Sequence, residues 1–181
     1  KPRLTIGSIT SSGALVVTTN ANMAITNRIY VGDRNTGTLT IEGGTLQAKG
    51  SSGNNIFNVA NTAANYTARG QLTVSGDGRI LFNGNLLTFS AGVNTNTANS
   101  SAIATISQTG GTISGTAFLQ VSNNTTVTSG YSLSSQISLQ AGTFSLSGST
   151  TASNAFGNNS LTTGNAHVAL TVSSNMDTFY L

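Results

Sequence analysis

The chain has 181 residues and a formal net charge of +3, yet only 6% of its residues are charged, against about 25% in a typical soluble domain. The cations are scattered singly, and no Lys, Arg, Asp or Glu occurs between Ile80 and Met176, which argues against a nucleic-acid partner because a polyanion groove needs charge along its length. The absence of cysteine excludes disulfides and thiolate metal sites, and no apolar run of about 18 residues predicts a membrane span.

The chain is rich in Gly, Ser, Thr and Asn and has a single proline. Gly, Asn and Ser are poor helix formers, and no window shows the 3.6-residue apolar stripe of an amphipathic helix. We therefore expect an all-β protein with essentially no α-helix. Its neutral polar composition favours an extracellular or cell-surface location after removal of a signal peptide.

Taken in order, residues 1–12 contain a short alternating stretch, Leu4-Thr5-Ile6-Gly7-Ser8-Ile9. Alternation with a period of two predicts a strand. We expect this segment to be separate from the rest of the fold, either as an N-terminal cap or as a strand donated to a neighbouring molecule. Residues 13–181 are expected to form the main domain.

Residues 13–181 repeat one pattern of short strands separated by glycine- or asparagine-containing corners. In residues 37–48, for example, Leu39 and Ile41 alternate with threonines, and Gly43-Gly44 supplies a sharp corner before Leu46 and Ala48. The first inward residue of the corresponding strand falls at residues 72, 104, 137 and 170 in the later copies, roughly every 33 residues. A repeat of this length predicts a parallel β-solenoid of about six three-strand coils, each burying its apolar face against its neighbours.

The repeat also predicts columns of like residues along the solenoid axis. With this spacing and a shorter opening copy, the two inward columns of the first strand are Leu15, Leu39, Leu72, Ala104, Ile137 and Leu170, and Val17, Ile41, Val74, Ile106, Leu139 and Val172. The outward column between them is Val16, Thr40, Thr73, Thr105, Ser138 and Thr171, and one inward column of the third strand is Val31, Val59, Phe89, Val121 and Phe156. Asp33 and Asn61, with Asn123 and Asn158, are expected to form a short polar ladder at the third corner.

Residues 30–48, Tyr-Val-Gly-Asp-Arg-Asn-Thr-Gly-Thr-Leu-Thr-Ile-Glu-Gly-Gly-Thr-Leu-Gln-Ala, combine a Val-Gly corner, Gly-Thr-Leu-Thr-Ile and Gly-Gly. This stretch resembles the β-strand repeat of autotransporter passengers and related bacterial surface proteins, with weaker likeness at residues 70–80 and 101–113. The resemblance implies a right-handed parallel β-helix exposed outside the cell. It implies no catalytic residue.

Few residues suggest chemistry, and we expect neither catalysis, nor a cofactor, nor a metal. Glu42 and Asp77 follow the first strands of successive coils and so are the acid pair to consider for glycoside cleavage, but Asp77 lies in the turn sequence Gly76-Asp77-Gly78. That turn is a single, faint copy of a calcium-binding repeat that needs tandem copies. The sequence pattern places no second metal-ligating side chain beside His167. A flat ice-binding face needs two outward columns of threonine, and the second outward column here is irregular: Thr38, Gln71, Ile103, Gln136 and Ala169.

The long polar loops hold the remaining candidates. Tyr66 and Tyr131 lie in loops of different coils and are the aromatic residues to consider for contact with surface glycans. Glycosylation is possible at the sequon asparagines Asn65, Asn99, Asn124 and Asn158, and Asn123 heads an overlapping sequon.

The two ends carry the main functional hypothesis. Apolar residues occur at both of them, and we expect assembly contacts at Leu4, Ile6, Ile9, Val172, Phe179 and Leu181. Uncapped ends of solenoids pair head to tail. When the head-to-tail contact does not close into a ring, the assembly grows as a filament. We therefore expect a structural subunit of an extracellular filament whose partner is a second copy of itself. The alternatives are a passenger or adhesin segment of a larger surface protein, and a glycan-binding or glycan-cleaving β-helix.

Overall fold

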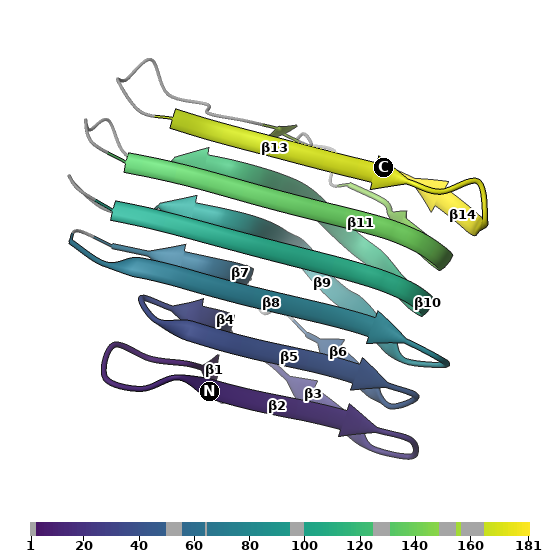
Figure 1. Cartoon of the computed structure of the whole chain (residues 1–181). Coiled ribbons are helices and arrows are strands. Elements are labelled where there is room, and N and C mark those ends of the chain that lie inside the picture. The colour runs from purple at the N-terminus through teal and green to yellow at the C-terminus, as the bar shows by residue number, and fades with distance from the viewer. Residues whose placement is uncertain are drawn as a thin grey trace.

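The computed structural model describes residues 3–49, 56–63, 65–94, 100–124, 131–148, 155–156 and 165–181. In these residues the chain forms strands and no helix, and the strands belong to one 14-stranded sheet that winds into a solenoid (Figure 1). All pairings between named strands are parallel, as the repeat predicted. No helix in the described part of the chain is long and apolar enough to cross a membrane.

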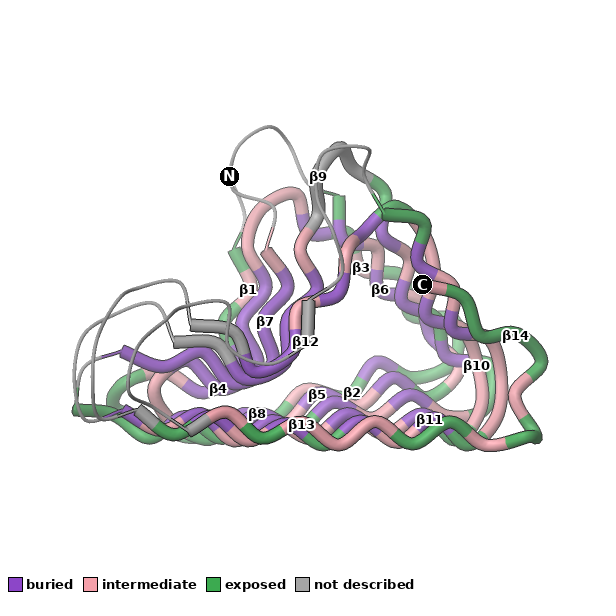
Figure 2. Tube along the Cα trace, turned by 90° about the horizontal axis from the view of Figure 1, so that it is seen from above, coloured by how far each residue is buried: buried purple, intermediate pink, exposed green. Residues whose placement is uncertain are grey.

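Figure 2 shows that the solenoid is three-sided, with buried residues, drawn in purple, along all three sides. The first side contains β2 (Gly13–Thr18), β5 (Thr36–Glu42), β8 (Thr67–Ser75), the start of β10 (Ser100–Asn124), the start of β11 (Tyr131–Leu146) and β13 (Asn165–Val172). The second side contains β3 (Asn22–Ile25), β6 (Thr45–Ala48), the start of β9 (Arg79–Asn94), the middle of β10, the end of β11 and β14 (Met176–Tyr180).

The third side contains β1 (Leu4–Ile6), β4 (Ile29–Asp33), β7 (Ile56–Thr62), the ends of β9 and β10, and β12 (Ala155–Phe156). Viewed from the C-terminal end, the chain passes counterclockwise from the first to the second to the third side while rising towards the viewer, so the coil is right-handed (Figures 1 and 2). β1 lies in the same sheet as the repeats because it pairs with β4 of its own chain.

The coils are less uniform than the repeat predicted. Among the described residues, the turns that begin with β2, β5, β8 and β10 have paired strands on all three sides. In the described part of the chain, the turn that begins with β11 has the two residues of β12 on its third side, and the last turn contains β13 and β14. The all-β solenoid is therefore confirmed, but the described residues contain fewer complete coils than the predicted six or so.

The fourth turn corrects the predicted columns by two residues. Ile106, not Ala104, pairs with Leu72 and Ile137, and Gln108 takes the inward place between Val74 and Leu139. The outward residue of this turn is accordingly Ser107 rather than Thr105. A shift of two residues preserves which side chains face inward, so alternation alone does not reveal it.

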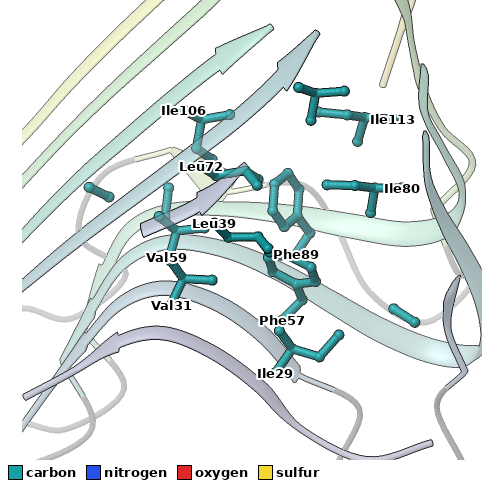
Figure 3. Packing of buried hydrophobic residues seen from close by; sticks show 14 of the residues in the cluster. Ile29, Val31, Leu39, Phe57, Val59, Leu72, Ile80, Phe89, Ile106 and Ile113 are labelled. Carbon is teal, nitrogen blue, oxygen red and sulfur yellow. The ribbon is translucent and has the colours of Figure 1, made fainter. Parts of the chain in front are cut away.

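The third side needs a similar correction. Ala91, rather than Phe89, pairs with Val59 and Val121, while Phe89 lies opposite Phe57 and Leu119. Figure 3 shows the resulting packing. Phe57 and Phe89 meet edge to face with ring centroids 5.3 Å apart, and Phe82 from the second side lies 5.2 Å from Phe89. All three rings are at most 3% exposed, so they fill the centre of the core.

A column of backbone bends shapes the third side. Gly32, Ala60, Gly92 and Ser122 occupy corresponding positions in four successive turns, and all have positive φ, from 52° to 77°. This conformation is normal for glycine but uncommon for alanine and serine. After the bend, the ends of β4 and β7 lie beside β8 of the first side (Figure 2). The bend places Asp33 and Asn61 between the two sides.

Candidate functional site: the two open ends

At the N-terminal end, three strands are paired along one edge only. β1 pairs with β4, β2 with β5 and β3 with β6, and no other described strand pairs with them. Leu4, Leu15 and Met23 of these strands pack partly buried against the core. An open hollow of about 540 Å³ lies beside them, lined by residues 4–8 and 11–15.

At the C-terminal end, β12 pairs only with β10, and β13 and β14 pair only with β11 in the described residues. Phe179 stacks on Phe144 of the turn below, with ring centroids 6.0 Å apart and an angle of 27°. Phe179 nevertheless remains 41% exposed, and Val172 is 40% exposed. The last turn thus presents inward-column side chains to the outside.

The distribution of partial burial singles out these two ends. The partly buried apolar side chains that pack against the described core all come from the first strands or the last residues of the chain, namely Leu4, Leu15, Met23, Ala166, Val168, Leu170, Met176 and Leu181. Between them, the same columns are at most a few per cent exposed. In the described residues, each end is therefore an open cross-section of the core, framed by strands that pair along one edge only.

The predicted assembly residues lie at these ends but differ in exposure. Leu4 and Leu181 are partly buried, and Val172 and Phe179 are exposed. Ile6 is only 5% exposed, whereas Ile9 lies in the turn after β1 and is 45% exposed. The sequence analysis did not include Leu15, Met23, Val168 and Leu170 among the assembly residues. Their position as the first or last members of inward columns could have identified them.

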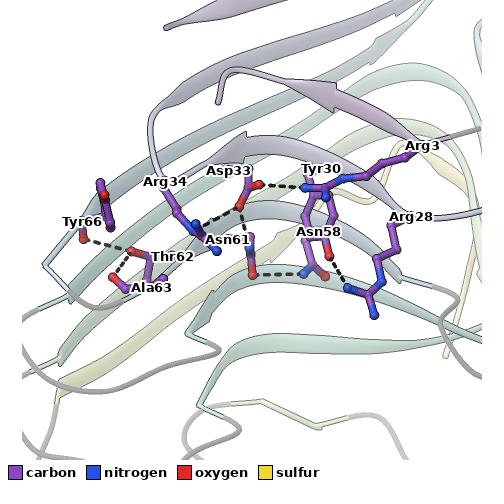
Figure 4. A network of polar contacts seen from close by, with 10 residues as sticks. All are labelled: Arg3, Arg28, Tyr30, Asp33, Arg34, Asn58, Asn61, Thr62, Ala63 and Tyr66. Carbon is purple, nitrogen blue, oxygen red and sulfur yellow. Dashed lines mark hydrogen bonds and ion pairs between the residues drawn. The ribbon is translucent and has the colours of Figure 1, made fainter. Parts of the chain in front are cut away.

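A buried polar network lies beside the third corner (Figure 4). The Asn61 side-chain amide donates to the Asp33 carboxylate at 2.8 Å, and the Asn58 side-chain amide donates to the side-chain oxygen Oδ1 of Asn61 at 3.4 Å. Arg3 forms an ion pair with Asp33 at 2.9 Å and lies over the Tyr30 ring, 4.5 Å from its centroid. The Asp33–Asn61 part of the predicted ladder is confirmed. Val93 occupies the next position in register, and Asn158 lies outside the described residues.

The side chains considered for catalysis meet at a shallow corner. Glu42 and Asp77 line one hollow of about 490 Å³ together with Thr18, Thr19, Gly43, Ser75 and Gly76. Both acids are exposed, and Ser75, not Asp77, lies opposite Glu42 in register. Within the described residues, no three His, Asp or Glu side chains gather where they could hold a metal ion. His167 is exposed on the first side.

The loop candidates are only partly described. Tyr66 is 38% exposed, and the Arg34 guanidinium lies 6.0 Å from its ring centroid, so one ring face already has a partner. The side chain of Tyr131 lies outside those that the structure describes, as do the side chains of Asn123 and Asn124. Asn65 is exposed in a turn with φ of 63°, whereas Asn99 lies outside the described residues.

The observed register differs from the predicted one in the residues that point outward on the first side. Its two central outward columns are Val16, Thr40, Thr73, Ser107, Ser138 and Thr171, and Ala14, Thr38, Gln71, Thr105, Gln136 and Ala169. The second column is more polar than predicted because Thr105 replaces Ile103. The irregular mixture of Thr, Gln and Ala remains.

Comparisons with models of protein families, with curated proteins and with solved structures give no match to this chain. Function therefore has to be argued from the solenoid and its two ends.

Proposed function

We propose that this protein is a structural extracellular protein, a subunit of a cell-surface filament whose solenoids join end to end by β-strand pairing. The observation that carries the proposal is the restriction of partly buried core side chains to the first and last turns. Both ends also have parallel strands with one free edge in the described chain. Pairing two such ends buries the apolar cross-sections and satisfies the backbone groups of the edges.

The proposed location and partner draw on composition and on the repeat. Only 6% of residues are charged, so like subunits approach each other with little repulsion. The absence of cysteine makes the fold independent of the redox conditions outside the cell. Residues 30–48 resemble repeats of bacterial surface proteins, which supports an exposed position on the cell.

The test compares the chain with variants that place charge at one end. Leu15 faces the open core, whereas Val16, next to it on β2, points outward and is 53% exposed. We expect the unaltered chain to form fibres under the electron microscope and a concentration-dependent increase of mass in light scattering. Leu15→Lys should abolish both, and the matched variant Val16→Lys should leave both intact. A wild-type protein that stays monomeric at high concentration would contradict the proposal.

The second candidate is a passenger or adhesin segment of a larger surface protein. The same observation supports it, because additional solenoid turns would cover the same free edges. A natural reading frame that continues the repeat beyond these residues, in a protein that stays monomeric, would favour this candidate over the filament.

A further inference from the structure

We propose that the filament contact has one defined register, in which β13 of one copy pairs with β2 of the next and fills the hollow beside β1. This inference rests on the proposed end-to-end assembly and adds the interface to it. The occupant of the hollow is a second copy of this chain.

The first step of the argument is the relation between the two ends. The described chain enters the solenoid on the third side, with β1, and leaves it on the second side, with β14. A second copy placed above the first therefore continues the same spiral, since its β1 follows β14 on the next side. In this arrangement β1 of the second copy lies above β12, its β2 above β13 and its β3 above β14.

The hollow at the N-terminal end fits this arrangement. It is lined by Leu4 and Ile6 of β1 and by Leu15 of β2, as well as by the turn between these strands. In the described chain, no strand of the first side lies below β2 and beside β1, and the hollow marks this place. β13 of the preceding copy occupies that place, and its inward side chains Val168 and Leu170 are only partly buried in the isolated chain.

The columns then fix the register. Leu170 continues the column of Leu15, Leu39, Leu72, Ile106 and Ile137, so the repeat of the pattern places it beside Leu15 of the next copy. On the second side, Phe179 continues the column of Met23, Leu46, Ile80, Ile113 and Phe144, so it lies beside Met23 of the next copy. Both contacts place apolar side chains on apolar side chains, which is favourable in the same way as inside the solenoid.

The net charges of the two ends are opposite in sign. In residues 1–33 the three cations Lys1, Arg3 and Arg28 outnumber the single acid Asp33, which pairs with Arg3, whereas Asp177 is the only Asp, Glu, Lys or Arg from residue 165 onwards. Such a difference favours head-to-tail over head-to-head encounter.

The register predicts which cysteines form a disulfide between copies, in a protein that has no cysteine of its own. Thr171 and Val16 both point outward and are exposed, and the register makes them neighbours across the contact. Paired residues on adjacent strands lie about 4.8 Å apart, within the range of a disulfide. Ala14 and Thr18 are also exposed on β2, but each is two residues away, about 8 Å from Thr171, beyond that range.

The experiment mixes Thr171→Cys protein with Val16→Cys, Ala14→Cys or Thr18→Cys protein under mild oxidation. We expect a disulfide-linked heterodimer with Val16→Cys at a rate at least about tenfold above the two controls, and fibres in all three mixtures. Fibres with preferential cross-linking at Ala14 or Thr18 would overturn the register and leave the filament intact. Absence of fibres would overturn the filament itself. If the natural chain is longer and covers these edges with its own residues, no Val16–Thr171 cross-link will form. That outcome would also overturn the inference.

Discussion

The side-chain amide of Asn61 donates a 2.8 Å hydrogen bond to the carboxylate of Asp33, which occupies the same position one turn closer to the N-terminus. Both residues are at least 93% buried, and Asn58 and Arg3 extend the network on either side. A buried carboxylate and amide without partners are unfavourable, so these residues stabilise the corner only as a set.

We therefore expect Asn61→Ala to lower the free energy of unfolding by about 1–3 kcal/mol, because Asp33 loses a buried donor. Urea denaturation followed by circular dichroism measures this difference. Asn22→Ala is the matched control, since the exposed Asn22 only accepts a hydrogen bond from Gln47 at 3.3 Å, and its effect should stay within about 0.5 kcal/mol. Equal effects of the two substitutions would show that the network contributes nothing.

Gln108 gives a second prediction. Its side chain is fully buried between Val74 and Leu139, where the other turns have apolar residues. The amide nitrogen donates to the Thr143 carbonyl at 2.9 Å and to the Gly111 carbonyl at 3.2 Å, but Oε1 has no hydrogen-bond partner in the described structure. Leucine fills this space without an unpaired acceptor, whereas alanine leaves a cavity.

Gln108→Leu should therefore change the free energy of unfolding by less than about 1.5 kcal/mol, and Gln108→Ala should lower it by about 2–4 kcal/mol. Chemical denaturation of both variants checks the order. If Gln108→Leu proved as destabilising as Gln108→Ala, the two donated hydrogen bonds would outweigh the unpaired oxygen.

Substitutions at Gly70 and Gly76 distinguish the effect of steric crowding from the effect of backbone strain. A Cβ on Gly70 would lie 2.2 Å from the Ala60 nitrogen and 2.4 Å from the Val31 carbonyl oxygen, and backbone cannot move aside there. Gly76 has φ of 55°, but a Cβ added to it would meet no described atom within 4 Å.

We expect Gly70→Ala to lower the free energy of unfolding by about 3 kcal/mol or more, or to prevent folding. Gly76→Ala should lower it by about 1 kcal/mol because of its positive φ, and Gly76→Asn by less. Thermal unfolding of the three variants tests the order. A folded Gly70→Ala protein of wild-type stability would contradict the close approach of the third and first sides.

Salt should have little effect on folding. The described ion pairs involve Asp33 with Arg3 and Arg34, whose side chains are 48% and 36% exposed, and residues 80–176 contain no Lys, Arg, Asp or Glu. Because the arginine of each pair is a third or more exposed, solvent and salt screen the interaction, and such a pair contributes about 1 kcal/mol. Raising NaCl from about 0.05 to about 0.5 M should shift the free energy of unfolding by less than about 1 kcal/mol. A larger loss would reveal charge interactions that the sequence does not suggest.

Much of this fold was predictable because the repeat fixes which side chains face inward. The two-residue errors at Ile106 and Phe89 arose because a shift of two residues leaves the same alternate side chains facing inward. For Ile106, a spacing of roughly 33 residues favoured the wrong one of the two alignments. Nothing in the repeat pattern placed Gln108 in the core. Its amide satisfies carbonyls at an irregular point of the β10–β11 pairing, which only the three-dimensional register reveals.

The open ends were predictable in kind but not in detail. Apolar residues near both termini indicated unpaired edges, yet exposure depends on which turn lies above each residue. Ile6 is covered by its own fold, while Val172, an inward residue by pattern, is exposed because no described strand lies above it. The positive φ of Ala60 and Ser122 had no sequence signal, since both residue types normally avoid that conformation.

The parallel pairing of the three sides has a mechanical consequence. Sheet hydrogen bonds run from turn to turn, along the solenoid axis, while the covalent chain runs around it. A pull along the axis therefore loads one layer of hydrogen bonds after another, and the chain should lengthen by peeling off turns from an end. A pull across the axis instead acts along the strands and loads many hydrogen bonds in shear at once. The molecule is expected to be compliant in the first direction and stiff in the second.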